Sequence, residues 1–129
     1  HRRLSPSTSA KAITSVTVNL STASGTQTVT GVGFTPKAVI LHGGVNGGAP
    51  AVFGLSTATS DYGVSDNFNA TANTWDVTSG GGQSMNFIIS ASASYQGEIS
   101  AFGADGFTIT WTKTGLPTGT AVIQYLAIG

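Results

Sequence analysis

The chain has no cysteine, few charged residues and no stretch with the apolar spacing of a helix. Without cysteine it has neither a disulfide framework nor a thiolate metal site, so packing and sheet hydrogen bonds must stabilise it. Charged residues make up 8% of the 129 residues, whereas about 25% is usual for soluble domains. Good helix formers are scarce, and no apolar run is long enough to cross a bilayer. These absences predict almost no helix and no membrane-spanning segment.

The charges that are present cancel, with five Lys and Arg residues against five Asp and Glu residues. The basic residues are scattered, and this argues against nucleic acid or an anionic membrane as a partner. So little charge also protects poorly against self-association. Two interpretations stay open: an ordinary secreted domain of low charge, or a subunit whose surface is covered by its neighbours in an assembly.

Ser and Thr supply the polar surface instead, at about a quarter of the chain, and Thr is a residue that favours strands. Short apolar stretches are separated by turn signals at the regular intervals of a sandwich. The sequence predicts one all-β domain over residues 13–129, an antiparallel β-sandwich of jelly-roll type with about nine or ten short strands. Residues 1–12 are polar and contain proline, so they are expected to form an extended arm or linker.

The last two strands give the clearest pattern. Phe107, Ile109 and Trp111 alternate with threonines, as in a strand buried on one side. The final stretch, Ala121 to Ile128, places apolar residues on both faces. It is therefore predicted to be a central strand with material packed on each side.

Other stretches are expected as follows. Glycines at Gly31 and Gly33 suit a bend with positive φ. The apolar strand from Lys37 to Leu41 is expected to end at His42, followed by a glycine-rich loop. The region from Ser56 to Ser79 is the most polar and the least predictable, and its part from Asp61 to Asp76 is expected to form loops.

No catalytic set is visible. His42 has no acid or second histidine nearby, no Gly-x-Ser-x-Gly elbow is present, and the glycine-rich loop lacks the lysine of a phosphate-binding loop. The acidic residues do not match the twelve-residue calcium loop. The sequence thus predicts a protein that is not an enzyme, with no cofactor and no metal ion.

Two groups of residues are candidates for binding. Tyr62, Asp66, Asn73 and Trp75 combine aromatic rings with carboxylate and amide groups, the types that recognise sugars. The alternative is that Trp75 and its neighbour Phe68 belong to the core and the polar groups cap turns.

The second group is Arg2, Arg3 and Leu4, which would form an assembly arm laid across a neighbouring subunit. The alternative there is a frayed terminus. The chain begins at His1 instead of Met, so either a leading segment is removed or the chain is part of a longer product.

Three segments carry a family resemblance: Gly33 to Ile40, Asp105 to Trp111, and Tyr125 to Gly129. Together they resemble small β-sandwich proteins and domains of tailed-bacteriophage virions, such as minor tail, head decoration and fibre proteins. The resemblance covers about a third of the chain, and its motifs are mostly strands and turns.

The resemblance implies a non-enzymatic virion protein, found on the extracellular particle, that docks on a capsid or tail. It also implies a homo-oligomer, with a trimer favoured, that presents loops to the host surface. Two other functions stay open: a carbohydrate-binding module that recognises a cell-surface glycan, and a subunit of a secreted surface filament.

Overall fold

A computed structural model describes residues 9–46, 50–69, 72–79 and 82–129; at residues 12–14, 66–69 and 72–79 only the backbone is described. This part of the chain forms ten strands and no helix, and therefore no helix that could cross a membrane. The strands are β1 (Ala10–Asn19), β2 (Gly25–Val29), β3 (Ala38–Val45), β4 (Ala51–Thr57), β5 (Asp61–Asn69), β6 (Ala72–Ser79), β7 (Met85–Ser90), β8 (Ala93–Gly103), β9 (Gly106–Thr114) and β10 (Thr120–Ile128).

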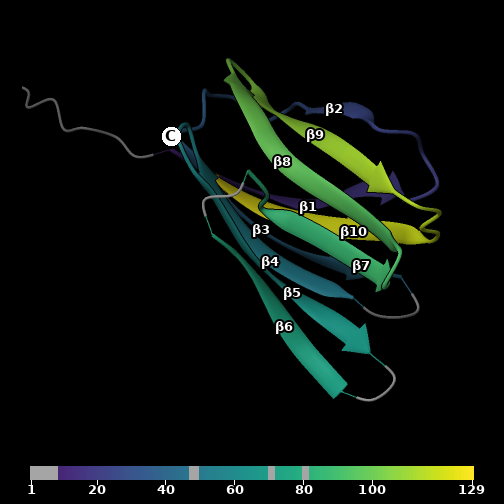
Figure 1. The fold of residues 1–129 in the computed structure, drawn as a ribbon. Helices are drawn as coiled ribbons and strands as arrows, with labels where there is room; N and C mark the ends of the chain where they lie inside the picture. The colour runs from purple at the N-terminus through teal and green to yellow at the C-terminus, as the bar shows by residue number, and fades with distance from the viewer. Residues whose placement is uncertain (1–8, 47–49, 70–71, 80–81) are drawn as a thin grey trace, which may run out of the picture.

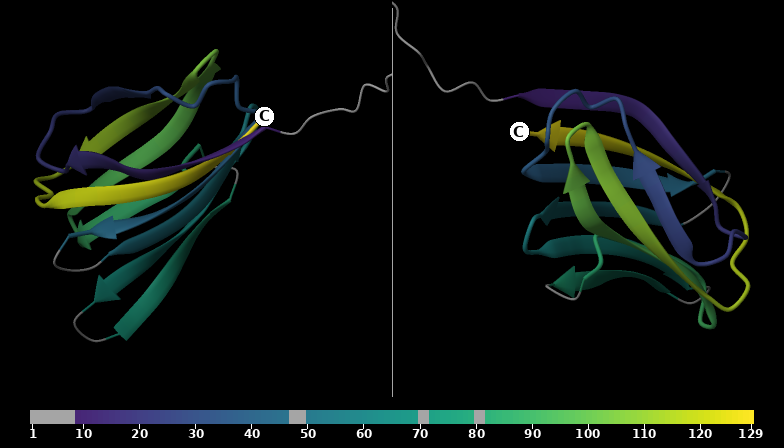
Figure 2. Two further views of the ribbon diagram at one scale, coloured as in Figure 1. Left: turned by 180° about the vertical axis from the view of Figure 1, so that it is seen from behind. Right: turned by 90° about the horizontal axis from the view of Figure 1, so that it is seen from above.

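The strands form two antiparallel sheets that pack on each other (Figure 1). The larger sheet has the order β1-β10-β3-β4-β5-β6, and the smaller has the order β2-β9-β8-β7. Viewed from above, strands of the smaller sheet cross obliquely over those of the larger one (Figure 2). The predicted all-β sandwich is confirmed. Its jelly-roll feature is the nested pairing of β1 with β10 and of β2 with β9, whereas β3 to β6 and β7 to β9 are meanders.

Aromatic side chains from β7, β8, β9 and β10 pack together between the two sheets. The Trp111 ring stacks on Tyr95 with their centroids 5.0 Å apart, and Phe87 lies 6.2 Å from the same ring. Phe107 meets Tyr125 edge to face at 4.9 Å. All five are at most 3% exposed, so they form the centre of the core.

The sandwich is thin where β7 packs over β4 and β5. The inward positions there are small: Gly54 pairs with Gly63, and Val52 pairs with Ser65. A Cβ atom placed on Gly54 would lie 1.9 Å from the backbone oxygen of Ser84, which is fully buried. Small inward residues therefore allow the backbone of the second sheet to approach closely.

Three boundaries differ from the sequence expectations. Strand β3 does not end at His42 but runs on to Val45, because β10 and β4 pair with it on both sides. The polar middle region forms the hairpin of β5 and β6 instead of loops. Residues 10–12 of the expected arm belong to β1, since Ala10 already pairs with Ile128 in the sheet, and residues 1–8 lie outside the described residues.

Asp105 joins two segments that are far apart in sequence. Its carboxylate accepts hydrogen bonds from the backbone N–H groups of Gly31, at 3.0 Å, and Gly33, at 2.7 Å. Both glycines have positive φ, 87° and 86°, as the sequence predicted. Both bonds lower the pKa of the Asp105 carboxyl below its ordinary value of 3.8, and the bond from Gly31 has the larger effect. The turn before β9 thus holds the bend before β3.

We expect Asp105→Asn to lower the midpoint of thermal unfolding, because the amide can accept only one of these bonds well. The Asp105 carboxyl has a lower pKa in the folded than in the unfolded chain, so its ionised form stabilises the folded state. This stabilisation is complete above a pH of about 4 and is lost as the pH falls through the folded-state pKa. The difference in midpoint between the two proteins should therefore narrow below pH 4. Calorimetry at a series of pH values measures it, and a difference that does not change with pH would contradict this role.

Candidate functional site: the outer face of the larger sheet

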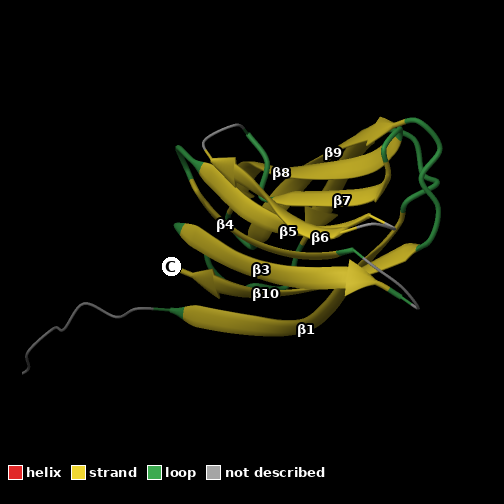
Figure 3. Ribbon diagram, turned by 60° about the horizontal axis from the view of Figure 1, so that its bottom comes forward, coloured by secondary structure: helices red, strands yellow, loops and turns green. Residues whose placement is uncertain are grey.

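One side of the six-stranded sheet faces away from the smaller sheet and is called the outer face below. No element of the described chain lies over it (Figure 2 and Figure 3). The alternating burial of β3, β4 and β10 shows which residues point there. On β4, for example, Val52, Gly54 and Ser56 are buried, whereas Phe53 and Leu55 are exposed.

The register aligns the outward residues of β10, β3, β4 and β5 in rows across the sheet. The first row is Leu126, Ile40, Leu55 and Tyr62; the second is Gln124, His42, Phe53 and Val64; the third is Val122, Gly44 and Ala51. Phe53 is 49% exposed, Leu55 41% and Tyr62 43%. Large apolar side chains thus lie side by side on the outer face, and contiguous exposed patches of this kind mark interaction sites.

Strand β10 is central, as predicted, but only one of its sides is covered within the described chain. Ile123, Tyr125 and Ala127 point inward and are buried, whereas Val122 and Leu126 point to the outer face and are only partly buried. Within the described residues, the prediction of packing on both sides is therefore wrong. The sequence of β10 carries apolar residues for a contact that the described part of the fold does not supply.

The outer face carries no Lys, Arg, Asp or Glu at the outward positions of β10, β3, β4 and residues 61–65 of β5. Asp61 points inward, where it is buried and accepts a hydrogen bond from the Ser56 hydroxyl. His42, predicted to end its strand, instead lies in the middle of β3 and is exposed on this face, paired with Gln124 and Phe53.

The smaller sheet has an outward side of opposite character. Apart from Ala101, its described outward positions on β2, β9 and β8 are polar: Thr26, Thr28, Thr108, Thr110, Thr112, Ser94, Gln96, Glu98 and Ser100. Some of these groups bond to one another, as when the Thr110 hydroxyl donates to Ser100 at 2.8 Å. The smaller sheet therefore presents a mainly polar surface that suits contact with water, and the larger sheet presents an apolar surface that suits burial.

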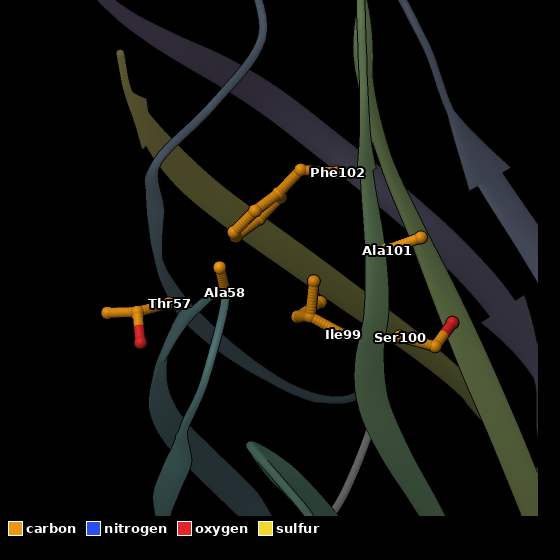
Figure 4. Close-up of a pocket in the computed structure, with 6 residues that line it drawn as sticks. All are labelled: Thr57, Ala58, Ile99, Ser100, Ala101 and Phe102. Atoms are coloured by element: carbon orange, nitrogen blue, oxygen red, sulfur yellow. The ribbon is translucent and has the colours of Figure 1, made fainter.

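A small cavity of about 210 Å³ lies between the β4–β5 turn and β8 (Figure 4). The side chains of Ile99 and Phe102 both point toward this turn, with Ser100 and Ala101 on the other side of the strand (Figure 4). A shift of register between Ile99 and Ala101 produces this arrangement, since a bulge re-aims side chains. The lining has no charged or titratable side chain, so the cavity offers no acid, base or nucleophile pair.

A second hollow, of about 390 Å³, lies at the edge of the sandwich between β1 and β2. Trp111 and Tyr95 line it, but they are 3% and 1% exposed. The Trp111 indole N–H donates to Gln27 Oε1 at 2.9 Å, and Gln27 Nε2 donates to the Thr17 carbonyl at 3.0 Å. The polar groups are thus paired and the ring faces are covered, which leaves little for a sugar to stack on.

The candidate sugar-binding residues all fall on the β5–β6 hairpin. Asp66 is the direct cross-strand partner of Trp75, and Asn73 pairs with Phe68. Tyr62 pairs with Ser79 at the other end, four residues and roughly 13 Å along the strand from Asp66. The side chains of Asp66, Asn73 and Trp75 lie outside the described residues. A sugar site here stays a prediction, with Tyr62 apart from the other three.

The candidate assembly arm, Arg2, Arg3 and Leu4, lies outside the described residues. The described chain begins at Ser9, whose carbonyl accepts a hydrogen bond from the N–H of Gly129 at 2.8 Å. Both ends of the sandwich domain are therefore held together at one corner.

Phe53 and Leu55 are the residues that sequence reasoning missed. Their strand was expected, but its residue pattern favours the wrong side as the one that faces the core. Alternation of large and small residues would by itself place Phe53 and Leu55 inside. The only available signal was the two-sided apolar pattern of β10, which lies two strands away in the same sheet.

No family model, no curated protein and no solved structure matches this chain. The resemblance of its end segments to phage-virion sandwiches therefore remains an expectation from sequence.

Proposed function

We propose that the protein is a non-enzymatic structural subunit that assembles with copies of itself and docks on a larger particle. The kind of particle is the tailed-bacteriophage virion suggested by the end segments, with a capsid or tail protein as the docking partner. Its location would then be the extracellular particle.

The observation that carries the proposal is the outer face. It combines exposed Phe53, Leu55 and Tyr62 with an absence of charge at the described outward positions of β10, β3, β4 and residues 61–65 of β5. A free monomer of low charge with such a face would be prone to non-specific association. A subunit whose neighbours cover that face would not associate in this non-specific way. The polar side of its smaller sheet would then face solvent.

The assembly proposal also accounts for the composition. A chain with only 8% charged residues needs little charge if part of its surface is buried in contacts. The two-sided apolar pattern of β10 has the same explanation, because the second side is completed by another molecule.

Two measurements test this function. Light scattering after size exclusion should show a mass above the 12.9 kDa of one chain, and immunogold labelling should place the chain on virions released by the cells that carry its gene. A monomer at every concentration would overturn self-assembly. If the protein forms oligomers in solution but the immunogold label is absent from virions, the virion assignment is overturned and the structural role still stands.

A further inference from the structure

We infer that the partner on the outer face is a second copy of this chain, packed sheet against sheet about a two-fold axis. The inference rests on the proposed self-assembly and names its contact. Other occupants, a different protein or a third copy, become outcomes of the test.

The size of the face fits such a contact. Six strands about 4.8 Å apart, each about eight residues long at about 3.4 Å per residue, give a face of roughly 800 Å². A stable interface of standard size buries about 800 Å² on each partner. Sheets pack face to face at about 10 Å with interdigitating side chains, so one copy can cover the whole outer face of the other.

The shape of the face is complementary to itself. Phe53 protrudes with 49% of its surface exposed. The next row of the sheet has Gly44 and Ala51 at the outward positions, and Gly44 is the diagonal neighbour of Phe53, about 7–8 Å away. A two-fold axis between these rows places Phe53 of each copy over the small residues Gly44 and Ala51 of the other. Each copy supplies one large side chain and one pair of small residues, as an isologous interface requires.

The charge pattern favours a copy over an unlike protein. Partners of different sequence are commonly selected by opposite charges across the contact, and the described outward positions on β10, β3, β4 and residues 61–65 of β5 carry none. In a two-fold contact, a group near the axis lies opposite the same group of the other copy. A charged group there would therefore be repelled by an identical charge. An uncharged centre is therefore the condition under which this face can pair with itself.

The test compares charged substitutions on the two sheets of the purified full chain. We expect the unchanged protein to have twice the mass of one 12.9 kDa chain. Phe53→Asp should raise the dimer dissociation constant by at least about 30-fold, the effect expected at a central apolar anchor. Thr112→Asp, at an exposed position on β9 of the smaller sheet, is the matched control and should leave the dimer unchanged.

Leu55→Asp serves as a second variant if Phe53→Asp does not fold, with circular dichroism as the check of folding. A crosslinking readout adds the geometry, since the chain has no cysteine of its own. Because the packed sheets lie about 10 Å apart, a thiol-specific crosslinker of about that length should join Ala51→Cys to its copy, whereas it should not join Thr112→Cys.

The outcomes separate this inference from the proposed function. A trimer, or a dimer that both charged variants leave intact, would overturn the face-to-face pair while self-assembly stands. A dimer that Thr112→Asp disrupts as strongly would also overturn it. A monomer from micromolar to near-millimolar concentration would overturn both.

Discussion

Replacing Gly54 by alanine should lower the free energy of unfolding by about 3 kcal/mol, at the upper end of what overpacking of a core costs. The new Cβ atom would lie 1.9 Å from the Ser84 backbone oxygen and 3.1 Å from its Cβ. A backbone atom cannot turn aside as the tip of a flexible side chain can. The two sheets would have to separate at their thin end, and this would loosen the packing of β7 on β4 and β5.

Gly25→Ala is the matched control for this change. Gly25 also lies in a strand, and a Cβ atom there would meet nothing closer than the Ala23 carbonyl oxygen at 4.0 Å. We expect an effect within about 0.5 kcal/mol, because the substitution also reduces the entropy of the unfolded chain. Urea unfolding at one fixed protein concentration measures both variants, since association would make the apparent stability depend on concentration. Equal losses in the two variants would contradict the close approach at Gly54.

The architecture could be predicted from sequence where one residue pattern decides the outcome. The alternation of Phe107, Ile109 and Trp111 with threonines matches a strand buried on one side, and all three are at most 3% exposed. The apolar stretch from Ala121 to Ile128 is a central strand, as expected. In both cases the local pattern and the tertiary environment favour the same structure.

The sequence was a poor guide where pairing partners override local preference. Gly43 and Gly44 predict a loop on their own, yet they lie in β3, between two strands that supply ladder hydrogen bonds on both sides. A Cβ atom on Gly43 would lie 2.5 Å from the Val122 carbonyl oxygen, so the close approach of β10 is a reason for glycine here. Similarly, the polar residues of β5 and β6 form a hairpin because each strand pairs with the other.

The outer face could not be predicted because the side-chain periodicity of β4 favours the wrong side as the buried one. A strand with large residues at alternate positions can turn either side to the core, and β4 turns Val52, Gly54 and Ser56 inward. The reason lies about thirty residues away, at Ser84, whose backbone occupies the space above Gly54. Only the packing of the second sheet decides that Phe53 and Leu55 face outward.

The apolar pattern of β10 also supports assembly. This pattern predicts cover on two sides, and the described part of the fold covers one. Either the second side is exposed without reason, or a contact outside the chain completes it. The uncharged row beside it, which contains Ile40, Leu55 and Tyr62, favours the second explanation.

Replacing Trp111 by alanine should lower the free energy of unfolding by about 3–5 kcal/mol, the usual cost of removing a large aromatic side chain from a core. Its ring stacks on Tyr95, contacts Phe87, and lies over Gly97, where a Cβ atom would be 2.7 Å from it. The substitution also leaves Gln27 Oε1 without the indole N–H that donates to it. An unpaired acceptor near the core adds to the loss of packing.

Trp111→Phe separates these two contributions. Phenylalanine retains an aromatic ring against Tyr95 but cannot donate to Gln27, so we expect a loss of about 1–2 kcal/mol, mainly from the missing hydrogen bond and the smaller ring. Far-UV circular dichroism during urea unfolding is the suitable measurement, because removing Trp111 leaves Trp75 as the one remaining tryptophan and changes the fluorescence signal. If alanine and phenylalanine cost the same, the hydrogen bond to Gln27 would be the main contribution. Truncation of a buried aromatic side chain normally causes a large loss of stability. If neither substitution lowers the free energy of unfolding by more than about 1 kcal/mol, the core does not depend on the Trp111 ring.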